Sequence, residues 1–402
     1  MPAPAPFELT RRDPRYAVVE IFGGDNNLAA YIPRDLKEAL DGMGDDGSML
    51  ALIDHLSRPT EVIEITRKRA RRVEAPGEID TGDPETLAAF LARAFVSYGA
   101  ETPIALGFWD HGTGVFDEND DNEYTVAVHA PTTHFLDPPK RLKSARRLFG
   151  RNVTHLLHAE AMLHDDTNSG ILTTREAGSV VSAALKRAER GKLAAIFSDT
   201  CLNGMVEVLT EFGAATDYVI GSQALEPGTG WDYRRFLSAV RAPFDGHAFS
   251  RAAVAGYEDC YQTRTDLHPC TLGAFATDRD IAARFKGLIE AAVGDESFTR
   301  LDAARGATTC FDDRDSYDLV EFAGLVATDA PGPLASAARA LEQSVIAARV
   351  SSVALGASVA GAQGLSFWFP RSRDAFEKTR PFYSRLKFDR AAGWTNYLNR
   401  HR

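Results

Sequence analysis

A histidine and a cysteine each stand where a predicted buried strand ends, a placement that suits a thiol nucleophile and its base. The apolar run 103–109 leads to His111 and the run 193–198 leads to Cys201. Both runs are typical of central strands in a parallel sheet. Because ligands bind beyond the carboxyl ends of such strands, the two side chains can meet at one rim of the sheet. There the imidazole can take the thiol proton, and a thiolate attacks a carbonyl far better than a thiol.

The residues beside this pair can supply further parts of that chemistry. Residues 202–209 are predicted to form a helix whose N-terminus would favour the ionised form of Cys201. The backbone N–H groups of Gly112 and Cys201 can face a developing oxyanion, and a glycine at position 112 permits a close approach. On spacing alone, however, an inert small cysteine and a hydrogen-bonded structural histidine are the better interpretation.

The surrounding sequence alternates strand and helix patterns. The predicted strands are residues 16–22, 49–53, 103–109, 193–199, 217–221, 350–359 and 365–369, and predicted helices begin near Leu28, Asp83, Thr174 and Leu334. Strands that alternate with helices imply parallel pairing. The fold class is therefore α/β, a mostly parallel central sheet of about six strands flanked by helices, with a C-terminal α/β extension packed on the same sheet.

The chain divides into three expected parts. Residues 1–14, which begin with alternating proline and alanine, are expected to be a disordered tail. Residues 15–232 form the core that carries the histidine and the cysteine, with an insertion at 115–170. Residues 233–402 form a C-terminal subdomain that completes the fold. A chain of 402 residues with 44% hydrophobic content can bury a core of this size.

Several motifs resemble those of the clostripain family of cysteine peptidases, which belong to the caspase-like group. They are Ile21-Phe22-Gly23-Gly24-Asp25-Asn26-Asn27-Leu28, Trp109-Asp110-His111-Gly112-Thr113-Gly114, Asp199-Thr200-Cys201-Leu202-Asn203-Gly204, Gly221-Ser222-Gln223-Ala224-Leu225-Glu226-Pro227-Gly228-Thr229-Gly230-Trp231 and Gly364-Leu365-Ser366-Phe367-Trp368-Phe369-Pro370. The resemblance covers nearly the whole chain from about Tyr16. It implies a caspase-like fold and a cysteine endopeptidase in which His111 is the general base and acid and Cys201 the nucleophile.

The resemblance also implies a preference for basic substrates. In the family, an acidic residue at the position of Asp199 helps to line a pocket for the Arg or Lys before the scissile bond, where a carboxylate would pair with the cation. The alternative is that Asp199 caps the next helix. The family often has Gly-Asp-Gly-Trp where this chain has Gly228-Thr229-Gly230-Trp231, and Asp232 is expected to compensate. Asn26 and Asn27 would orient His111 or simply finish a turn.

The insertion contains a basic stretch that such a pocket would accept. Its candidate self-cleavage residues are Lys143, Arg146, Arg147 and Arg151. Caspase-like enzymes often mature by a cut between their histidine and cysteine halves, so the protein is expected to be latent until self-cleavage or an activating partner switches it on. The alternative is an amphipathic helix or a partner-binding arm whose arginines face solvent.

No cofactor or metal ligand is expected to be required, and calcium enters only by family resemblance. Residues 117–123 place oxygen ligands at alternate positions but lack the glycine and distal glutamate of an EF-hand. Residues 164–170 are a second weak candidate that also suits a turn. A solvated acidic loop is the preferred interpretation of the first stretch, so the expected metal site is none.

Composition limits the expected partners and location. A net charge of −11 argues against nucleic-acid binding, and the basic run Arg67-Lys68-Arg69-Ala70-Arg71-Arg72 is read as a solvated strand end or hairpin. No run is long enough to span a bilayer. Four cysteines give no disulfide framework and the start lacks a secretory pattern, which favours the cytoplasm. The expected partner is a protein or peptide substrate, and the alternative function is a catalytically silent caspase-like adaptor that binds peptides.

Overall fold

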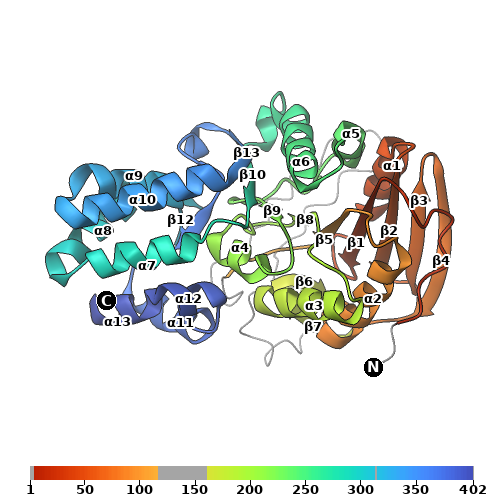
Figure 1. Ribbon diagram of the computed structural model, residues 1–402, viewed down its shortest axis with the longest axis horizontal. Coiled ribbons are helices and arrows are strands. Elements are labelled where there is room, and N and C mark those ends of the chain that lie inside the picture. The colour runs from red at the N-terminus through yellow and green to blue at the C-terminus, as the bar shows by residue number, and fades with distance from the viewer. Residues whose placement is uncertain (1–3, 116–160, 313–314, 402) are drawn as a thin grey trace.

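A nine-stranded sheet forms the centre of the molecule (Figure 1). The computed structural model describes residues 4–115, 161–312 and 315–401. In spatial order the sheet contains β13 (Arg349–Leu355), β10 (Cys270–Ala276), β9 (Tyr218–Gly221), β8 (Ala195–Asp199), β5 (Ile104–Trp109), β1 (Tyr16–Gly24), β2 (Gly47–His55), β3 (Thr60–Thr66) and β4 (Arg69–Gly77). The strands from β9 to β2 in this order are parallel to one another. The predicted α/β class and mostly parallel sheet are confirmed.

The central strands are apolar on both faces because helices cover both sides. In β1, Val18 and Phe22 belong to one hydrophobic core, while Val19 and Ile21 belong to the other. All four side chains are fully buried. This alternation explains why the sequence shows continuous apolar runs here, as expected for parallel strands buried on both faces.

The helices form two layers around the sheet. On one face lie α1 (Ile32–Gly42), α5 (Tyr233–Ala239) and α6 (Gly246–Tyr261), seen above the sheet in Figure 1. The other face carries α2 (Pro84–Ser97), α3 (Thr174–Arg187) and α4 (Val206–Phe212). Asp83 caps α2 through the backbone N–H of Thr86, and Thr173 caps α3 through that of Glu176, as residues with short oxygen-bearing side chains do at N-caps. None of the helices in the described residues is long and apolar enough to cross a membrane.

Antiparallel strands extend both edges of the sheet, so it has more strands than expected from the sequence. The basic run forms the turn and strand of a β3–β4 hairpin, and Lys68 at the turn has a positive φ of 54°. Arg71 pairs with Glu64, and Arg72 pairs with Glu61, both at 2.9 Å. The predicted hairpin is thus confirmed, and its arginines face acidic side chains of the neighbouring strand.

The C-terminal half adds strands to the same sheet, forms a second sheet and contributes further helices. β10 pairs antiparallel with β9, and β13 pairs antiparallel with β10. A second sheet contains β11 (Cys310–Phe311), β12 (Ser316–Asp318) and β14 (Ser366–Trp368). The remaining helices are α7 (Ile281–Ala291), α8 (Gly294–Ala307), α9 (Leu319–Asp329), α10 (Gly332–Ala348), α11 (Arg373–Tyr383), α12 (Lys387–Ala392) and α13 (Trp394–His401). The predicted extension on the same sheet is confirmed.

The N-terminal segment packs against the core at Phe7, so the expectation of a disordered tail over residues 1–14 is wrong from Phe7 onward. The ring of Phe7 lies 5.7 Å from that of Phe90, and the Arg93 guanidinium lies 4.0 Å above it. The backbone N–H of Phe7 donates to Ser97 Oγ at 2.7 Å. Burial of one phenylalanine contributes roughly 2 kcal/mol, which anchors a segment whose proline and alanine content alone suggests disorder.

Candidate active site

His111 follows β5, and the end of β1 next to it supplies a partner for its ring. Phe22 in β1 pairs in register with Trp109 in β5, so the residues after both strands meet at one edge of the sheet. His111 Nε2 lies 2.5 Å from Asn27 Oδ1. Because an amide oxygen only accepts hydrogen bonds, Nε2 carries the proton in the neutral ring and Nδ1 is the acceptor. Asn27 therefore selects the tautomer in which Nδ1 can take up a proton.

Asp110 holds the turn that carries His111, a role that the sequence analysis missed. Its buried carboxylate accepts hydrogen bonds from Asn26 Nδ2 at 2.7 Å and from the backbone N–H groups of His111 and His164, both at 2.5 Å. Burial raises the pKa of Asp110 to about 8, while these donors lower it. The signal available in the sequence was an aspartate directly before the candidate histidine. Asn26 thus supports His111 through Asp110, whereas Asn27 contacts the ring.

Cys201 lies just beyond β8, and its surroundings differ from the predicted ones. Helix α4 begins only at Val206, so no helix N-terminus lies directly behind the thiol. The reason is that Gly204 and Met205 pair with neighbouring strands instead, since the Gly204 N–H donates to Ser222 O at 2.7 Å and Met205 bridges to Ser366. The expected helix over residues 202–209 is wrong in its first turn.

The thiol of Cys201 accepts a hydrogen bond from the polypeptide rather than from a helix end. The backbone N–H of Glu226 donates to Sγ at 3.2 Å. Burial raises the pKa of the Cys201 thiol to about 12, although this N–H lowers it. At neutral pH the thiol is therefore protonated, and a base must remove its proton before it can act as a nucleophile.

The turns that carry His111 and Cys201 are in contact. β5 and β8 are neighbours, with Trp109 opposite Asp199. A Cβ atom at Gly112 would lie 2.4 Å from the Cys201 carbonyl oxygen, closer than real contacts allow. Only glycine permits this approach. The predicted oxyanion donors, the N–H groups of Gly112 and Cys201, lie in these two touching turns, and their role stays a prediction.

Asp199 lies buried below Cys201, at the end of β8. Its carboxylate accepts from the Trp231 N–H and the Tyr233 hydroxyl, both at 3.1 Å. Glu226 lies beside it and accepts from the indole N–H of Trp231 at 3.2 Å. Burial raises the pKa of Asp199 and raises that of Glu226 well above its ordinary value, and the proximity of the two carboxyls adds to the rise for Glu226. Asp199 therefore does not cap the following helix, which was the alternative interpretation of the sequence.

Two more buried carboxyls complete a group that we call the Asp199 cluster: Glu20, Asp35, Asp199 and Glu226. Tyr233 donates its hydroxyl proton to Glu20, and Trp109 Nε1 donates to Asp35 at 2.9 Å. Arg34 pairs with Asp35 at 2.5 Å. Burial is the main reason that the pKa of Glu20 and that of Asp35 lie well above their ordinary values. The sequence analysis did not identify Glu20, Asp35 or Glu226, since they lie on separate elements.

Of the other predicted residues, Asp232 has a structural role, and the rest lie outside the described residues. Asp232 caps α5 by accepting from the Arg235 N–H at 2.9 Å and pairs with the Arg235 guanidinium at 2.9 Å. Its role in substrate binding stays a prediction. The self-cleavage candidates Lys143, Arg146, Arg147 and Arg151, and the acidic residues 117–123, lie outside the described residues.

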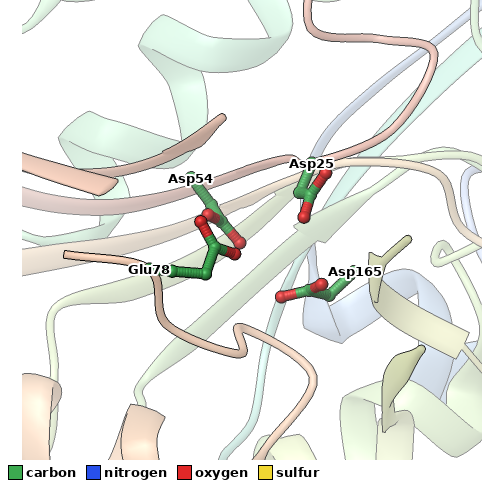
Figure 2. A group of neighbouring side chains, drawn as sticks. All are labelled: Asp25, Asp54, Glu78 and Asp165. Carbon is green, nitrogen blue, oxygen red and sulfur yellow. The ribbon is translucent and has the colours of Figure 1, made fainter. Parts of the chain in front are cut away.

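One group of side chains in the described residues could hold a metal ion. It contains Asp25, Asp54, Glu78 and Asp165, and we call it the Asp25 cluster (Figure 2). Asp165 ends β6 (Ala161–Asp165), which forms a hairpin with β7 (Gly170–Thr173). The 164–170 stretch is thus the end of a strand and a turn, as one interpretation of the sequence had it.

Solved structures with the same fold are cysteine proteases. A secreted C11 cysteine protease from Bacteroides thetaiotaomicron in complex with an irreversible peptide inhibitor has a TM-score of 0.68 at 15% identity, over 95% of this chain and 99% of that chain. An inactive zymogen C11 protease from Parabacteroides distasonis has a TM-score of 0.67 at 17% identity, over 96% of this chain and 99% of that chain. A search of curated proteins gave no match. The fold is therefore that of the caspase-like cysteine peptidases.

The sequence profile of the clostripain family matches residues 21–130 and 157–400. The chain belongs to this family and is a cysteine peptidase. The resemblance of the sequence motifs is thereby confirmed.

Proposed function

We propose that this protein is an endopeptidase that cleaves after arginine, and less efficiently after lysine, through Cys201 and His111. The observation that carries the proposal is the contact between the His111 and Cys201 turns next to a buried cluster of carboxyls. A cysteine and an imidazole at adjoining strand ends are the parts that acyl transfer needs.

The chemistry follows from the protonation states. His111 Nδ1 takes the proton of Cys201, and the thiolate adds to the carbonyl carbon before the scissile bond. The N–H groups of Gly112 and Cys201 donate to the oxyanion. The imidazolium then protonates the leaving amine, an acyl-enzyme remains, and water hydrolyses it with His111 again as the base. Because the pKa of the thiol is raised, Cys201 depends on His111 to take up its proton.

The Asp199 cluster supports the proposed preference for a cation. Cys201, Glu226 and Gly230 are partly exposed, and Glu226 and Gly230 both adjoin the buried Asp199 carboxyl. A Cβ atom at Gly230 would lie 2.9 Å from Asp199 Oδ2, so glycine is the residue that leaves the most space beside this carboxyl. A guanidinium can form two parallel hydrogen bonds with a carboxylate, whereas an ammonium binds as a point charge. This difference is why arginine should be preferred to lysine.

Latency is the second part of the proposal. The loop that carries Glu226 donates its N–H to the Cys201 thiol, which a substrate must replace. A structural neighbour is described as an inactive zymogen. We propose self-cleavage after one or more of Lys143, Arg146, Arg147 and Arg151, all of which follow the preference of the proposed pocket.

A peptide panel that varies only the residue before the cut tests the function. Wild type should cleave peptides with Arg best, then Lys, and Cys201→Ala or His111→Ala should lower kcat/KM by at least about 10⁴-fold, because removal of one member disables the pair. Asp259→Asn, an exposed change, is the matched control. Full turnover by Cys201→Ala would overturn the assignment, and a folded wild type that binds but never cleaves peptides would favour the adaptor.

Self-cleavage has its own readout. Denaturing gels and N-terminal sequencing should show wild type cut after a basic residue between positions 143 and 151, while Cys201→Ala remains one chain. A fully active wild type that stays intact would show that activity does not depend on the cut.

A further inference from the structure

The loop of residues 226–231, which we call the pocket loop, adjoins both the nucleophile and the carboxyl that the proposed function assigns to specificity. Its first N–H group donates to Cys201 Sγ at 3.2 Å, and its last donates to Asp199 Oδ2 at 3.1 Å. Gly230 lies against the same carboxyl. The loop belongs to no helix or strand, so its shape depends on contacts with other parts of the chain.

Arg34, in the first turn of α1, supplies such a contact. Its Nη2 atom donates to the carbonyl oxygen of Thr229, in the middle of the pocket loop. Thr229 is buried, so its carbonyl group cannot rely on bulk water and needs a donor from the protein. Arg34 and Thr229 are 195 residues apart in sequence, so this contact forms only in the folded chain.

The guanidinium of Arg34 is itself held in one orientation. Asp35 Oδ1 accepts from Arg34 Nε at 2.8 Å and from Nη2 at 2.5 Å, and Asp35 Oδ2 accepts from Trp109 Nε1 at 2.9 Å. A guanidinium is a rigid planar fork, so a carboxylate that contacts two of its nitrogens fixes its direction. Trp109 ends β5 and precedes His111 by two residues. The contact therefore joins the pocket loop to the strand that leads to the candidate base.

A second contact from α1 fixes the chain directly after the pocket loop. Glu38, one turn beyond Arg34, accepts from the Tyr233 N–H at 3.2 Å, at the start of α5. The two helices lie side by side on the same face of the sheet (Figure 1). They are so close that a Cβ atom at Gly42 would lie 2.6 Å from Arg234 Cα. Helix α1 is thus a rigid support for the loop and for the helix that follows it.

Neutral groups provide further contacts to the middle of the pocket loop. The Tyr261 hydroxyl lies 2.6 Å from Thr229 Oγ1 and donates to the Gly230 carbonyl oxygen at 2.5 Å. The Gly230 N–H donates to the Pro227 carbonyl oxygen at 2.8 Å, within the loop. A hydrogen bond from a charged donor contributes more than one between neutral groups. Arg34 is therefore expected to be the strongest of these attachments.

We propose that Arg34 is a positioning residue for substrate recognition, which holds the pocket loop in place beside Asp199 so that a substrate guanidinium can bind there. This inference rests on the proposed function. Arg34 acts through Thr229 and does not itself contact the substrate. Because Asp35 pairs with the guanidinium at 2.5 Å, its carboxylate offsets the charge of Arg34 and limits repulsion of a substrate cation. Loss of Arg34 should thus loosen the pocket without removing its carboxylate.

Amide hydrogen exchange tests the attachment directly, in the full-length Cys201→Ala protein so that no cleavage intervenes. Mass spectrometry of peptides that cover residues 228–231 measures the exchange rate of the loop. Arg34→Gln should raise this rate at least about fivefold, because a hydrogen bond from a charged donor is lost. Lys37→Gln removes a positive charge from an exposed position of the same helix, where Lys37 pairs with Asp41, and should exchange as the parent does.

Kinetics with Cys201 intact separate a positioning role from a merely structural one. Arg34→Gln should raise KM for arginine peptides at least about tenfold and leave kcat within about twofold, because Asp110 holds the His111 turn independently. Leucine peptides, which do not use the carboxylate, should be cleaved as by wild type. Arg34→Lys keeps the charge beside Asp35 but not the planar fork, so it should fold and lie between the two.

The two measurements distinguish this inference from the proposed function. If Arg34→Gln accelerates loop exchange and wild type never cleaves peptides, the proposed function fails and the attachment stands. If wild type prefers arginine and the variant keeps both its preference and its loop exchange, the inference fails and the function stands. A lost preference with unchanged loop exchange would also contradict the proposed route through Thr229. Should Arg34→Gln not fold, Arg34→Lys decides, and wild-type exchange and preference in that variant would overturn the proposal.

Discussion

The Asp199 cluster and the Asp25 cluster both bury carboxyls beside the candidate catalytic turns, but only the first has a basic partner. Arg34 pairs with Asp35 of the Asp199 cluster, and a tyrosine hydroxyl donates to Asp199. In the described residues the Asp25 cluster accepts only from neutral donors, and one of its members is exposed. Burial raises the pKa of Glu226 in the first cluster and that of Asp54, to about 7, in the second. A fixed guanidinium thus compensates part of the negative charge in the first cluster, whereas protons can reduce the charge of both.

The two clusters also differ in their place relative to the catalytic residues. The Asp199 cluster lies below the nucleophile, where the proposed cationic side chain of a substrate would bind. The Asp25 cluster brings its oxygens together from four elements next to the residues that hold the His111 turn. Three predictions test the distinction.

The largest effect is expected from Asp199→Asn. Asparagine keeps an acceptor for the Trp231 N–H but removes the charge, so kcat/KM for arginine peptides should fall about 10³-fold, equivalent to roughly 4 kcal/mol for a buried ion pair that loses one partner. Steady-state kinetics with matched arginine and leucine peptides measure the change in preference. Glu78→Gln, a change in the Asp25 cluster, is the control and should retain the preference. An unchanged preference in Asp199→Asn would show that the two clusters do not differ as proposed.

A smaller effect is expected from Asp110→Asn, at the point where the two regions meet. All three donors to Asp110 are N–H groups, so an amide nitrogen would face one of them without an acceptor. The free energy of unfolding should fall by about 1–3 kcal/mol, and kcat should fall because the His111 turn loosens. Urea unfolding and peptide kinetics measure both, with Asp259→Asn as the exposed control. Wild-type stability together with wild-type kcat would show that Asp110 holds nothing in place.

The smallest effect is a change in pH dependence in Glu226→Gln. Because the pKa of Glu226 is raised, the group gains its charge only as pH rises above the ordinary glutamate range. KM for arginine peptides should therefore fall with rising pH in wild type, and this part of the profile should disappear in Glu226→Gln. The same raised pKa means that the contribution of Glu226 to folding is fully present at low pH and is lost as pH rises through its folded-state pKa.

Glu258→Gln, the same change at an exposed position of α6, is the matched control for that profile. It should keep the wild-type pH dependence. Identical profiles for wild type and Glu226→Gln would mean that Glu226 does not contribute to the charge of the pocket.

The sequence predicted those elements whose signal is local. The buried strands β1, β5 and β8 appear as apolar runs, and the residues after them are the candidate catalytic ones. The start of α2 near Asp83 was equally visible. These features depend on hydrophobic periodicity and on residues within one turn of each other.

The errors concern features that depend on distant neighbours. The first turn of the helix predicted after Cys201 is replaced by pairing of Gly204 and Met205 with strands far along the chain. The Asp25 cluster could not be found from spacing, because Asp25, Asp54 and Glu78 share no motif and meet only when the sheet forms. Phe7 likewise acquires a partner only in the folded protein.

The arginine-rich edge strand β4 has a consequence for the behaviour of the protein in concentrated solution. An edge strand exposes unpaired backbone groups that can recruit another chain. Arg69 is exposed on β4, and Arg72 is also exposed although it pairs with Glu61, so that a second copy approaching this edge meets charged side chains. The hairpin therefore protects the open side of the large sheet from edge-to-edge aggregation, and variants that replace these arginines with valine should precipitate at lower protein concentrations.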